Sequence, residues 1–153
     1  MLFCVMVAVK KVLSAIPGLT LVELDVPVVS TQASHLSVLP KFKAELRDRE
    51  FRAAAEAGVT TFASIFHGCH RELIKFQPRV SFELLNFMEL IGEAMGMRIP
   101  DLYKRLALMG DIDAIVAETA EQAALHGLGL EEVRDAVAQD MFGAKPKPRR
   151  AHA

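Results

Sequence analysis

The sequence has few cysteines, few aromatic residues and almost no net charge, and each shortage excludes a class of protein. Two cysteines among 153 residues cannot form a disulfide scaffold, so the simpler interpretation is a reducing compartment, the cytoplasm. Aromatic residues make up 7% of the chain and the formal net charge is -1, which provides neither base-stacking platforms nor a field that attracts nucleic acid. We therefore expect a cytoplasmic protein that does not bind nucleic acid.

Several sequence signals of enzymes and membrane proteins are missing as well. The chain contains no glycine-rich phosphate loop, no nucleophile-elbow serine and no long repeat. The apolar residues 1–9 are too few to cross a bilayer, which needs about 20, and Lys10 and Lys11 follow them instead of preceding them as in a secretory signal. We expect a buried helix here, covered by a partner or a further segment, and no transmembrane segment.

The order of patterns predicts an α/β fold. With 52% hydrophobic residues the chain is long enough for one domain with a core, over residues 1–142, followed by a disordered basic tail over 143–153. The predicted elements are a helix over 5–16, a strand over 19–25, a loop over 28–35, a helix over 40–58, a strand over 59–66, a short helix from 71, a short strand over 79–82, and helices over 83–97, 101–110, 112–125 and 130–142.

Two of these strands and the helix between them predict a βαβ crossover in a small parallel sheet. The strands span 19–25 and 59–66, and helix 40–58 carries charges of alternating sign, which is typical of a solvated face. A right-handed crossover places the loops that follow the two strands at one edge of the sheet. The expected fold is therefore a small parallel sheet with flanking helices and a helical C-terminal part.

Chemistry is concentrated at one predicted corner between a strand and a helix. The apolar run over 62–66 ends at His67-Gly68-Cys69-His70, and helical spacing follows. Ligands in α/β folds often bind at the carboxyl ends of strands. Imidazole and thiolate side chains bind metals and take part in acid-base chemistry, although a cysteine here can also be a small hydrophobe and a histidine a helix cap.

A family resemblance adds to this interpretation. Residues 63–73, followed by 80–96, resemble the second half of the cysteine-rich CCG domain, and residues 12–24 resemble the segment that leads into its first motif. That domain recurs in the B subunit of heterodisulfide reductase and in iron-sulfur subunits of glycolate, lactate and glycerol-3-phosphate oxidoreductases. In it, one strand ends at Cys-Cys-Gly and a second at Cys-x-x-Cys, and together they hold an iron-sulfur cluster. The similarity covers about residues 8–110.

The resemblance implies site residues position by position. Cys69 corresponds to the second cysteine of Cys-x-x-Cys, and Phe66 occupies the first. The positions of Cys-Cys-Gly fall on Ser30, Thr31 and Gln32. Iron-sulfur clusters are bound by thiolates, so a chain with one of the expected cysteines does not assemble a normal cluster alone.

Three functions follow from this comparison. In the first, the chain is a structural or docking component of a redox complex, beside iron-sulfur or flavin partners. In the second, His67, Cys69, His70 and His35 hold zinc, iron or an atypical cluster. In the third, Cys69 is a thiol of low pKa at a helix N-terminus and acts in an oxidoreductase with His67 or His70 as its partner. A homo-oligomer is also compatible with the sequence.

Overall fold

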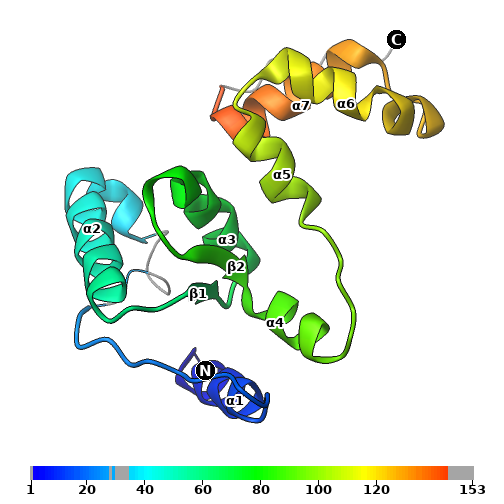
Figure 1. The fold of residues 1–153 in the computed structure, drawn as a ribbon. Helices are drawn as coiled ribbons and strands as arrows, with labels where there is room; N and C mark the ends of the chain where they lie inside the picture. Colours follow the sequence, from blue (N-terminus) through cyan, green and yellow to red (C-terminus); the bar gives the residue numbers. More distant parts are fainter. Residues whose placement is uncertain (1, 28, 30–34, 145–153) are drawn as a thin grey trace. The chain divides into compact units, whose positions relative to one another are not determined.

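The fold is mixed α/β and mostly helical. The computed structural model describes residues 2–27, 29 and 35–144, and for residues 2–5 and 35 it describes the backbone alone. Within this part of the chain it contains seven α-helices and one two-stranded parallel sheet (Figure 1). Residues 1–101 and 102–153 form two compact units, which are described separately below. The single domain expected over 1–142 stays a prediction.

The sheet of the first unit pairs β1 (Thr61–Ser64) with β2 (Glu83–Asn86). The strands are parallel, with Phe62 opposite Leu84, and α3 (His67–Leu73) and the 3-10 helix η3 (Ile74–Arg79) connect them. The predicted small parallel sheet is therefore confirmed. Because the strands are parallel, their carboxyl ends lie at the same edge of the sheet.

The predicted strand over 19–25 is wrong. These residues form no strand and follow α1 (Leu2–Ser14) as an irregular segment, in which Glu23 forms an ion pair with Lys10. Leu24 packs against the hydrophobic core of the unit. Leu21 and Val22 remain exposed, so the strand-like composition of this segment does not correspond to a buried strand, and the predicted crossover from 19–25 to 59–66 is wrong as well. The parallel pair comes one element later in the chain.

The second correction concerns the strand predicted over 79–82 and the helix predicted over 83–97. Residues 83–86 form β2, and helix α4 spans only Phe87–Ala94. Asn86 begins the helix with a capping box: its Oδ1 accepts from the Met88 N–H at 3.1 Å, and its N–H donates to Glu89 Oε1 at 2.7 Å. This motif satisfies backbone N–H groups that the first turn leaves without partners, which fixes where the helix begins.

A glutamine side chain covers the outer edge of β2. The Glu83 N–H donates to Thr60 O on the β1 side, so the alternate residues Phe82 and Leu84 direct their backbone groups away from β1. There Gln77 Nε2 donates to Phe82 O at 2.9 Å, and the Leu84 N–H donates to Gln77 Oε1 at 2.8 Å. The side chain of Gln77 therefore takes the place of a neighbouring strand.

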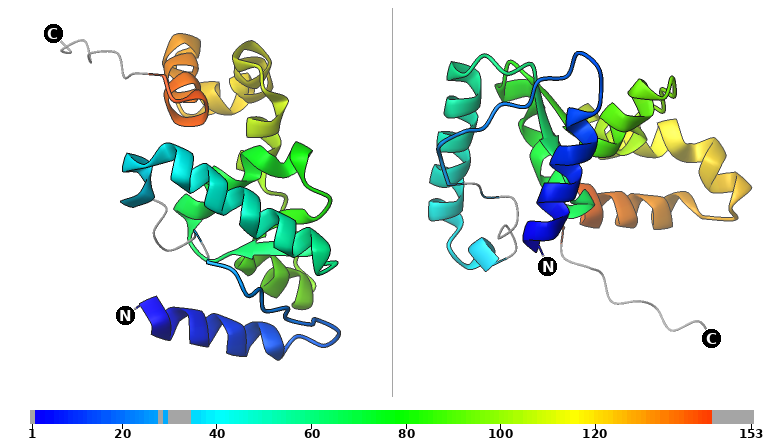
Figure 2. Two further views of the ribbon diagram at one scale, coloured as in Figure 1. Left: turned by 90° about the vertical axis from the view of Figure 1, so that its left-hand side faces the viewer. Right: turned by 90° about the horizontal axis from the view of Figure 1, so that it is seen from below.

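Helix α2 (Pro40–Glu56) covers one face of the sheet (Figure 2) and follows the 3-10 helix η2 (His35–Val38). Pro40 occupies the first turn, as predicted. The expectation that all its charges are solvated is wrong, because Arg47 and Glu50 are 4% and 1% exposed and pair with each other at 2.7 Å. Solvation is replaced there by a direct ion pair.

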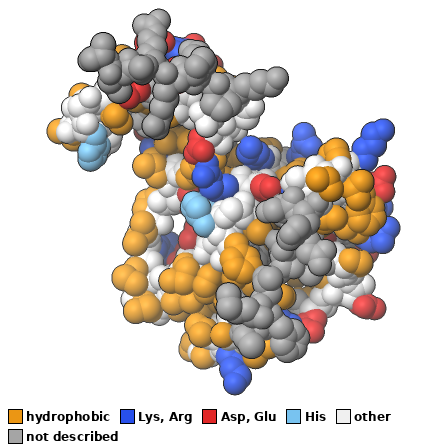
Figure 3. Space-filling model, turned by 180° about the vertical axis from the view of Figure 1, so that it is seen from behind, with side chains coloured by type: hydrophobic (Ala, Val, Ile, Leu, Met, Phe, Trp, Pro, Cys, Tyr) orange, Lys and Arg blue, Asp and Glu red, His pale blue; other side chains and the backbone are white. Residues whose placement is uncertain are grey.

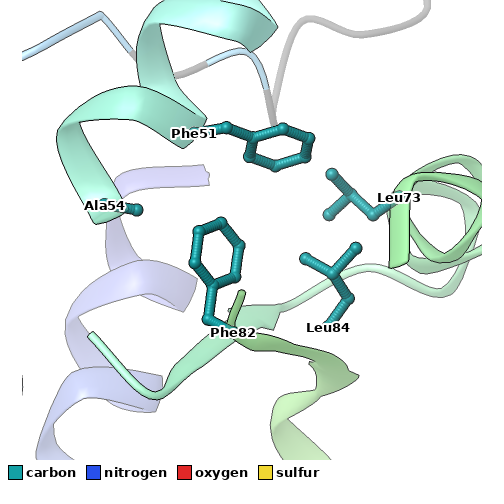
Figure 4. Packing of buried hydrophobic residues seen from close by; sticks show 5 residues of the cluster. All are labelled: Phe51, Ala54, Leu73, Phe82 and Leu84. Atoms are coloured by element: carbon teal, nitrogen blue, oxygen red, sulfur yellow. The ribbon is translucent and has the colours of Figure 1, made fainter. Parts of the chain in front are cut away.

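The core of the first unit lies between α2, the sheet and α3. Figure 4 shows its buried residues pointing toward one another: Phe51, Ala54, Leu73, Phe82 and Leu84. The ring of Phe51 meets the rings of Phe62, Phe76 and Phe82 edge-on, with centroids 5.5 to 5.7 Å apart. Such edge-to-face contacts stabilise a core beyond the area that they bury.

The second unit consists of α5 (Leu102–Met109), α6 (Ile112–Leu125) and α7 (Leu130–Phe142), which confirms the predicted helical C-terminal part. Asp111 caps α6 by accepting from the Ala114 N–H at 3.0 Å. The second unit has a small hydrophobic core of its own, which contains Leu106, Ile115 and Val137. The tail predicted over 143–153 lies outside the described residues from 145 onward. In the described part of the chain, no helix combines the length and the apolar character needed to cross a membrane.

Candidate metal-binding pocket

The parallel strands bring two helix starts together. Helix α3 begins shortly after β1, and α4 begins directly after β2 (Figure 1). The hydroxyl of Ser64 at the end of β1 donates to Leu85 O at 3.1 Å, which ties the two carboxyl ends to each other. Side chains in the first turns of α3 and α4, His70 and Glu89, therefore lie at one edge of the sheet.

His70 is deeply buried at this edge. Only 3% of it is exposed, and its Nε2 lies 2.6 Å from Asp101 Oδ2, a hydrogen-bonding distance. Its other ring nitrogen, Nδ1, is buried and has no hydrogen-bond partner within the described part of the chain. A buried polar atom without a partner costs about 1–3 kcal/mol, so this ring is only half satisfied by the protein.

Glu89 completes a set of three potential metal ligands. Ligand atoms of His70, Glu89 and Asp101 all lie within 4.8 Å of one another. Glu89 Oε1 already accepts the Asn86 N–H of the capping box, which holds the carboxylate in place and leaves Oε2 as the oxygen that can serve as a ligand. One imidazole and two carboxylates form a group that could hold a metal ion.

These residues line a pocket of about 660 Å³, a volume in the range of small-molecule sites. Its apolar wall comes from α4 and the segment after it: Met88, Ile91, Met95, Met97 and Ile99. In Figure 3, hydrophobic side chains surround a hollow at the left-hand edge of this unit. His67, Glu93 and Arg98 add polar groups to the lining. The pocket thus combines an apolar wall with a floor that carries the potential metal ligands His70, Glu89 and Asp101.

Two glycines shape the wall of this pocket. Gly96 has a φ of 76°, in the left-handed region that glycine adopts readily, and it turns the chain after α4. The Met97 N–H then donates to Gly92 O at 2.8 Å. A Cβ at position 92 would lie 3.3 Å from Met97 O, so glycine lets the returning chain approach the helix closely.

Helix α3 directs the residues of the predicted corner to different surroundings. His67 is exposed and lines the pocket with His70. Cys69 is half-buried, and the charges that act on it belong to Glu72 and to Lys43, Arg47 and Glu50 of α2. Ser30, Thr31, Gln32 and the side chain of His35 lie outside the described residues, so the predicted ligand set with Cys69 stays a prediction.

The surroundings of Cys69 do not favour a thiolate. Burial raises the pKa of the Cys69 thiol, and the carboxylate of Glu72 raises it further, while Arg47 and Lys43 lower it by less. Of these two cations, Lys43 is itself paired with Glu72 at 2.8 Å. The prediction of a low pKa is therefore wrong, because burial outweighs the favourable charges.

The charges beside Cys69 include the buried pair on α2. Burial raises the pKa of the Glu50 carboxyl, and the opposing effects are the charge and hydrogen bond of Arg47 and a hydrogen bond from the backbone of Val29. Val29 is itself fully buried. The chain therefore passes beside Glu50 just before residue 30.

Glu89 and Asp101 are the site residues that the sequence analysis missed. The helix predicted over 83–97 places Glu89 in its interior, and Asp101 is expected only at the start of the next helix. The Asn86-x-x-Glu89 spacing of a capping box could have located the start of α4 and hence the position of Glu89 at the sheet edge. No comparable local pattern points to Asp101.

Comparisons with protein-family models, curated proteins and solved structures found no match for this chain.

Proposed function

We propose that this chain is a structural or docking component of a redox complex, related to the CCG domain of heterodisulfide reductase. In this role it binds beside partners that carry iron-sulfur clusters or flavin. The observation that carries the proposal is the hydrogen bond of Val29 to Glu50, one of the charges that act on Cys69.

The relationship requires the loop with Ser30, Thr31 and Gln32 to lie on the Cys69 side of α3. The backbone N–H of Val29 donates to the Glu50 carboxylate, and Glu50 is one of the charges that act on Cys69. This position of Val29, the residue before the loop, supports the relationship. The strand β1, followed by a helix that carries Cys69 in its first turn, is the second point of agreement.

The raised pKa of Cys69 favours docking over catalysis by this chain. A thiol that stays protonated is a poor nucleophile and a poor metal ligand. With serine, threonine and glutamine at the positions of Cys-Cys-Gly, the chain also lacks the thiolates of a normal cluster. We therefore assign the redox chemistry to its partners.

An apolar surface beside Cys69 fits this role. Val38, Leu39 and Phe42 are 81%, 55% and 48% exposed where η2 meets the first turn of α2. The next residue, Lys43, joins this turn to α3 through its ion pair with Glu72. Large apolar side chains that are exposed together mark surfaces for protein partners.

The experiment compares complexes isolated from the source organism through a tagged copy of the chain. We expect the unaltered chain to elute on size exclusion with a partner that shows flavin or iron-sulfur absorbance. A Leu39→Asp/Phe42→Glu variant should lose this partner while α2 remains folded, because an acid at the N-cap and at the third helical position stabilises a first turn.

Leu125→Glu is the matched control, because this exposed residue lies in α6 of the second unit. It should retain the partner. Elution of the unaltered chain without any such chromophore would contradict the proposal, as would a double variant that binds as well as the original. Iron and acid-labile sulfide bound stoichiometrically to the isolated chain would contradict the loss of cluster ligands.

A further inference from the structure

We infer that His70, Glu89 and Asp101 bind one divalent transition-metal ion, of the class of Zn²⁺, at the floor of the apolar pocket. This site involves neither Cys69 nor the loop that precedes α2. The inference therefore does not depend on the proposed redox complex.

The donor set indicates the class of ion. Imidazole nitrogen suits zinc, iron and other first-row transition ions, and carboxylate oxygens bind them as well. Two carboxylates beside the imidazole also supply negative charge that a divalent cation can neutralise. Three protein ligands leave a coordination position for water or a bound molecule, as in catalytic zinc sites.

The half-satisfied ring of His70 is the independent sign of a missing ligand. Its side chain is 4% exposed, and Nε2 faces the Asp101 carboxylate. When Nε2 carries the proton of that hydrogen bond, a neutral ring presents a lone pair at Nδ1, and no group in the described chain donates to it. A buried imidazole lone pair is the group that a transition ion binds.

The ion can bind either ring nitrogen. At Nδ1 it leaves the hydrogen bond to Asp101 intact, which is the common carboxylate-histidine-metal arrangement. At Nε2 the ion replaces the proton, and the nitrogen and Oδ2 must separate from 2.6 Å to about 3.3 Å, the spacing of two tetrahedral ligands near 2.0 Å from zinc. Asp101 follows the exposed residues Ile99 and Pro100, so a shift of this size disturbs no core packing.

The test is calorimetric titration of the untagged, metal-free full chain with Zn²⁺, combined with the absorption spectrum of its Co²⁺ form. We expect one ion per chain and the weak visible bands of cobalt with nitrogen and oxygen ligands. Glu89→Gln should weaken Zn²⁺ binding by about 100-fold or more. This exceeds the loss of about 10–100-fold that is typical when a residue that only hydrogen-bonds to a metal ligand is replaced. The amide can still accept the Asn86 N–H, so α4 should keep its cap.

His70→Asn should weaken binding to a similar extent. Two control variants should bind Zn²⁺ as the original does: Cys69→Ser, and His126→Gln at the exposed end of α6. No zinc bound at about 0.1 mM, a concentration that saturates a site with a micromolar dissociation constant, would overturn the inference. Binding that survives Glu89→Gln but is lost with Cys69→Ser, with intense sulfur-to-cobalt absorption, would also overturn it and would favour the site predicted around Cys69.

Discussion

Among individual residues, Arg47 and Glu50 form a buried ion pair, and replacing one of them alone should lower the stability of the fold. Removing two charges from water is costly, and their attraction repays this only with good geometry and additional hydrogen bonds. Here the guanidinium lies 2.7 Å from the carboxylate and 5.7 Å from the ring centroid of Phe51, and the backbone of Val29 adds a hydrogen bond. The cost of burying the two charges is thus well compensated while both are present. Each charge loses this compensation when the other is removed.

We expect Arg47→Met to lower the free energy of unfolding by about 3–5 kcal/mol, because it leaves Glu50 buried without its cation. The double variant Arg47→Met/Glu50→Met should regain most of this loss, since it removes both charges and keeps the volume. Urea denaturation followed by circular dichroism measures both. A single variant as stable as the original chain would contradict the burial of this pair.

The thiol of Cys69 provides a prediction about pH. Because burial and Glu72 raise the pKa of Cys69, its reactive thiolate forms only at higher pH than in an unstructured peptide. In a Cys4→Ser background, the rate of alkylation by iodoacetamide should therefore rise at a higher pH for the folded chain than for the urea-unfolded chain. Glu72→Gln should move the folded profile to lower pH.

The same comparison of the folded and unfolded alkylation profiles can disprove the raised pKa of Cys69. Folded and unfolded profiles that coincide would mean that Arg47 and Lys43 cancel the effects of burial and Glu72 on the pKa of Cys69. A folded profile shifted to lower pH would mean that the two cations outweigh those effects; the thiol would then be activated, and the oxidoreductase interpretation would regain support.

Within the helices and strands, the capping box of α4 is the local motif that positions a site residue. Asn86→Ala should lower the free energy of unfolding by about 1 kcal/mol, whereas Asn86→Gly should cost only a few tenths, because glycine also serves as an N-cap. Thermal denaturation of both variants measures the difference. Equal effects of the two substitutions would mean that the Asn86 side chain does not cap the helix.

Most helices could be predicted from the sequence because their apolar spacing and their stop signals are local, although α3 begins at His67 instead of 71 and α4 at Phe87 instead of 83. Proline in the first turn of α2 and Asp111 before α6 marked their starts correctly. The segment 19–25 was mistaken for a strand because its composition is that of a strand, although a strand also requires a partner for its backbone. For β2, the alternation over 83–86 was hidden by the helical spacing that follows it.

The candidate site could be predicted only in part for the same reason. His70 was found because it lies at the end of a recognisable strand, β1. Glu89 depends on where β2 ends, and Asp101 is 31 residues from its partner His70, so neither position follows from local spacing. A correct assignment of β2 would have placed Glu89 at the sheet edge. The position of Asp101 next to His70 can be seen only in the folded chain.

For the chain as a whole, two separate cores predict two separate responses to substitution. Leu84 and Ile115 are both fully buried, one in the first unit and one in the second. Leu84→Ala and Ile115→Ala should each cost about 2–5 kcal/mol locally. Hydrogen exchange of the full chain should accelerate over 61–86 in the first variant and over 112–142 in the second. Equal acceleration in both regions would instead indicate one cooperative core.

The side chain of Gln77 also has a consequence for how this protein behaves at high concentration. Open strand edges act as templates onto which the strands of other molecules add, and repeated addition leads to fibrils. By occupying Phe82 O and the Leu84 N–H, Gln77 denies an incoming strand the groups that it would need on the outer side of β2. One amide thus blocks strand addition at one of the two sides of this very small sheet.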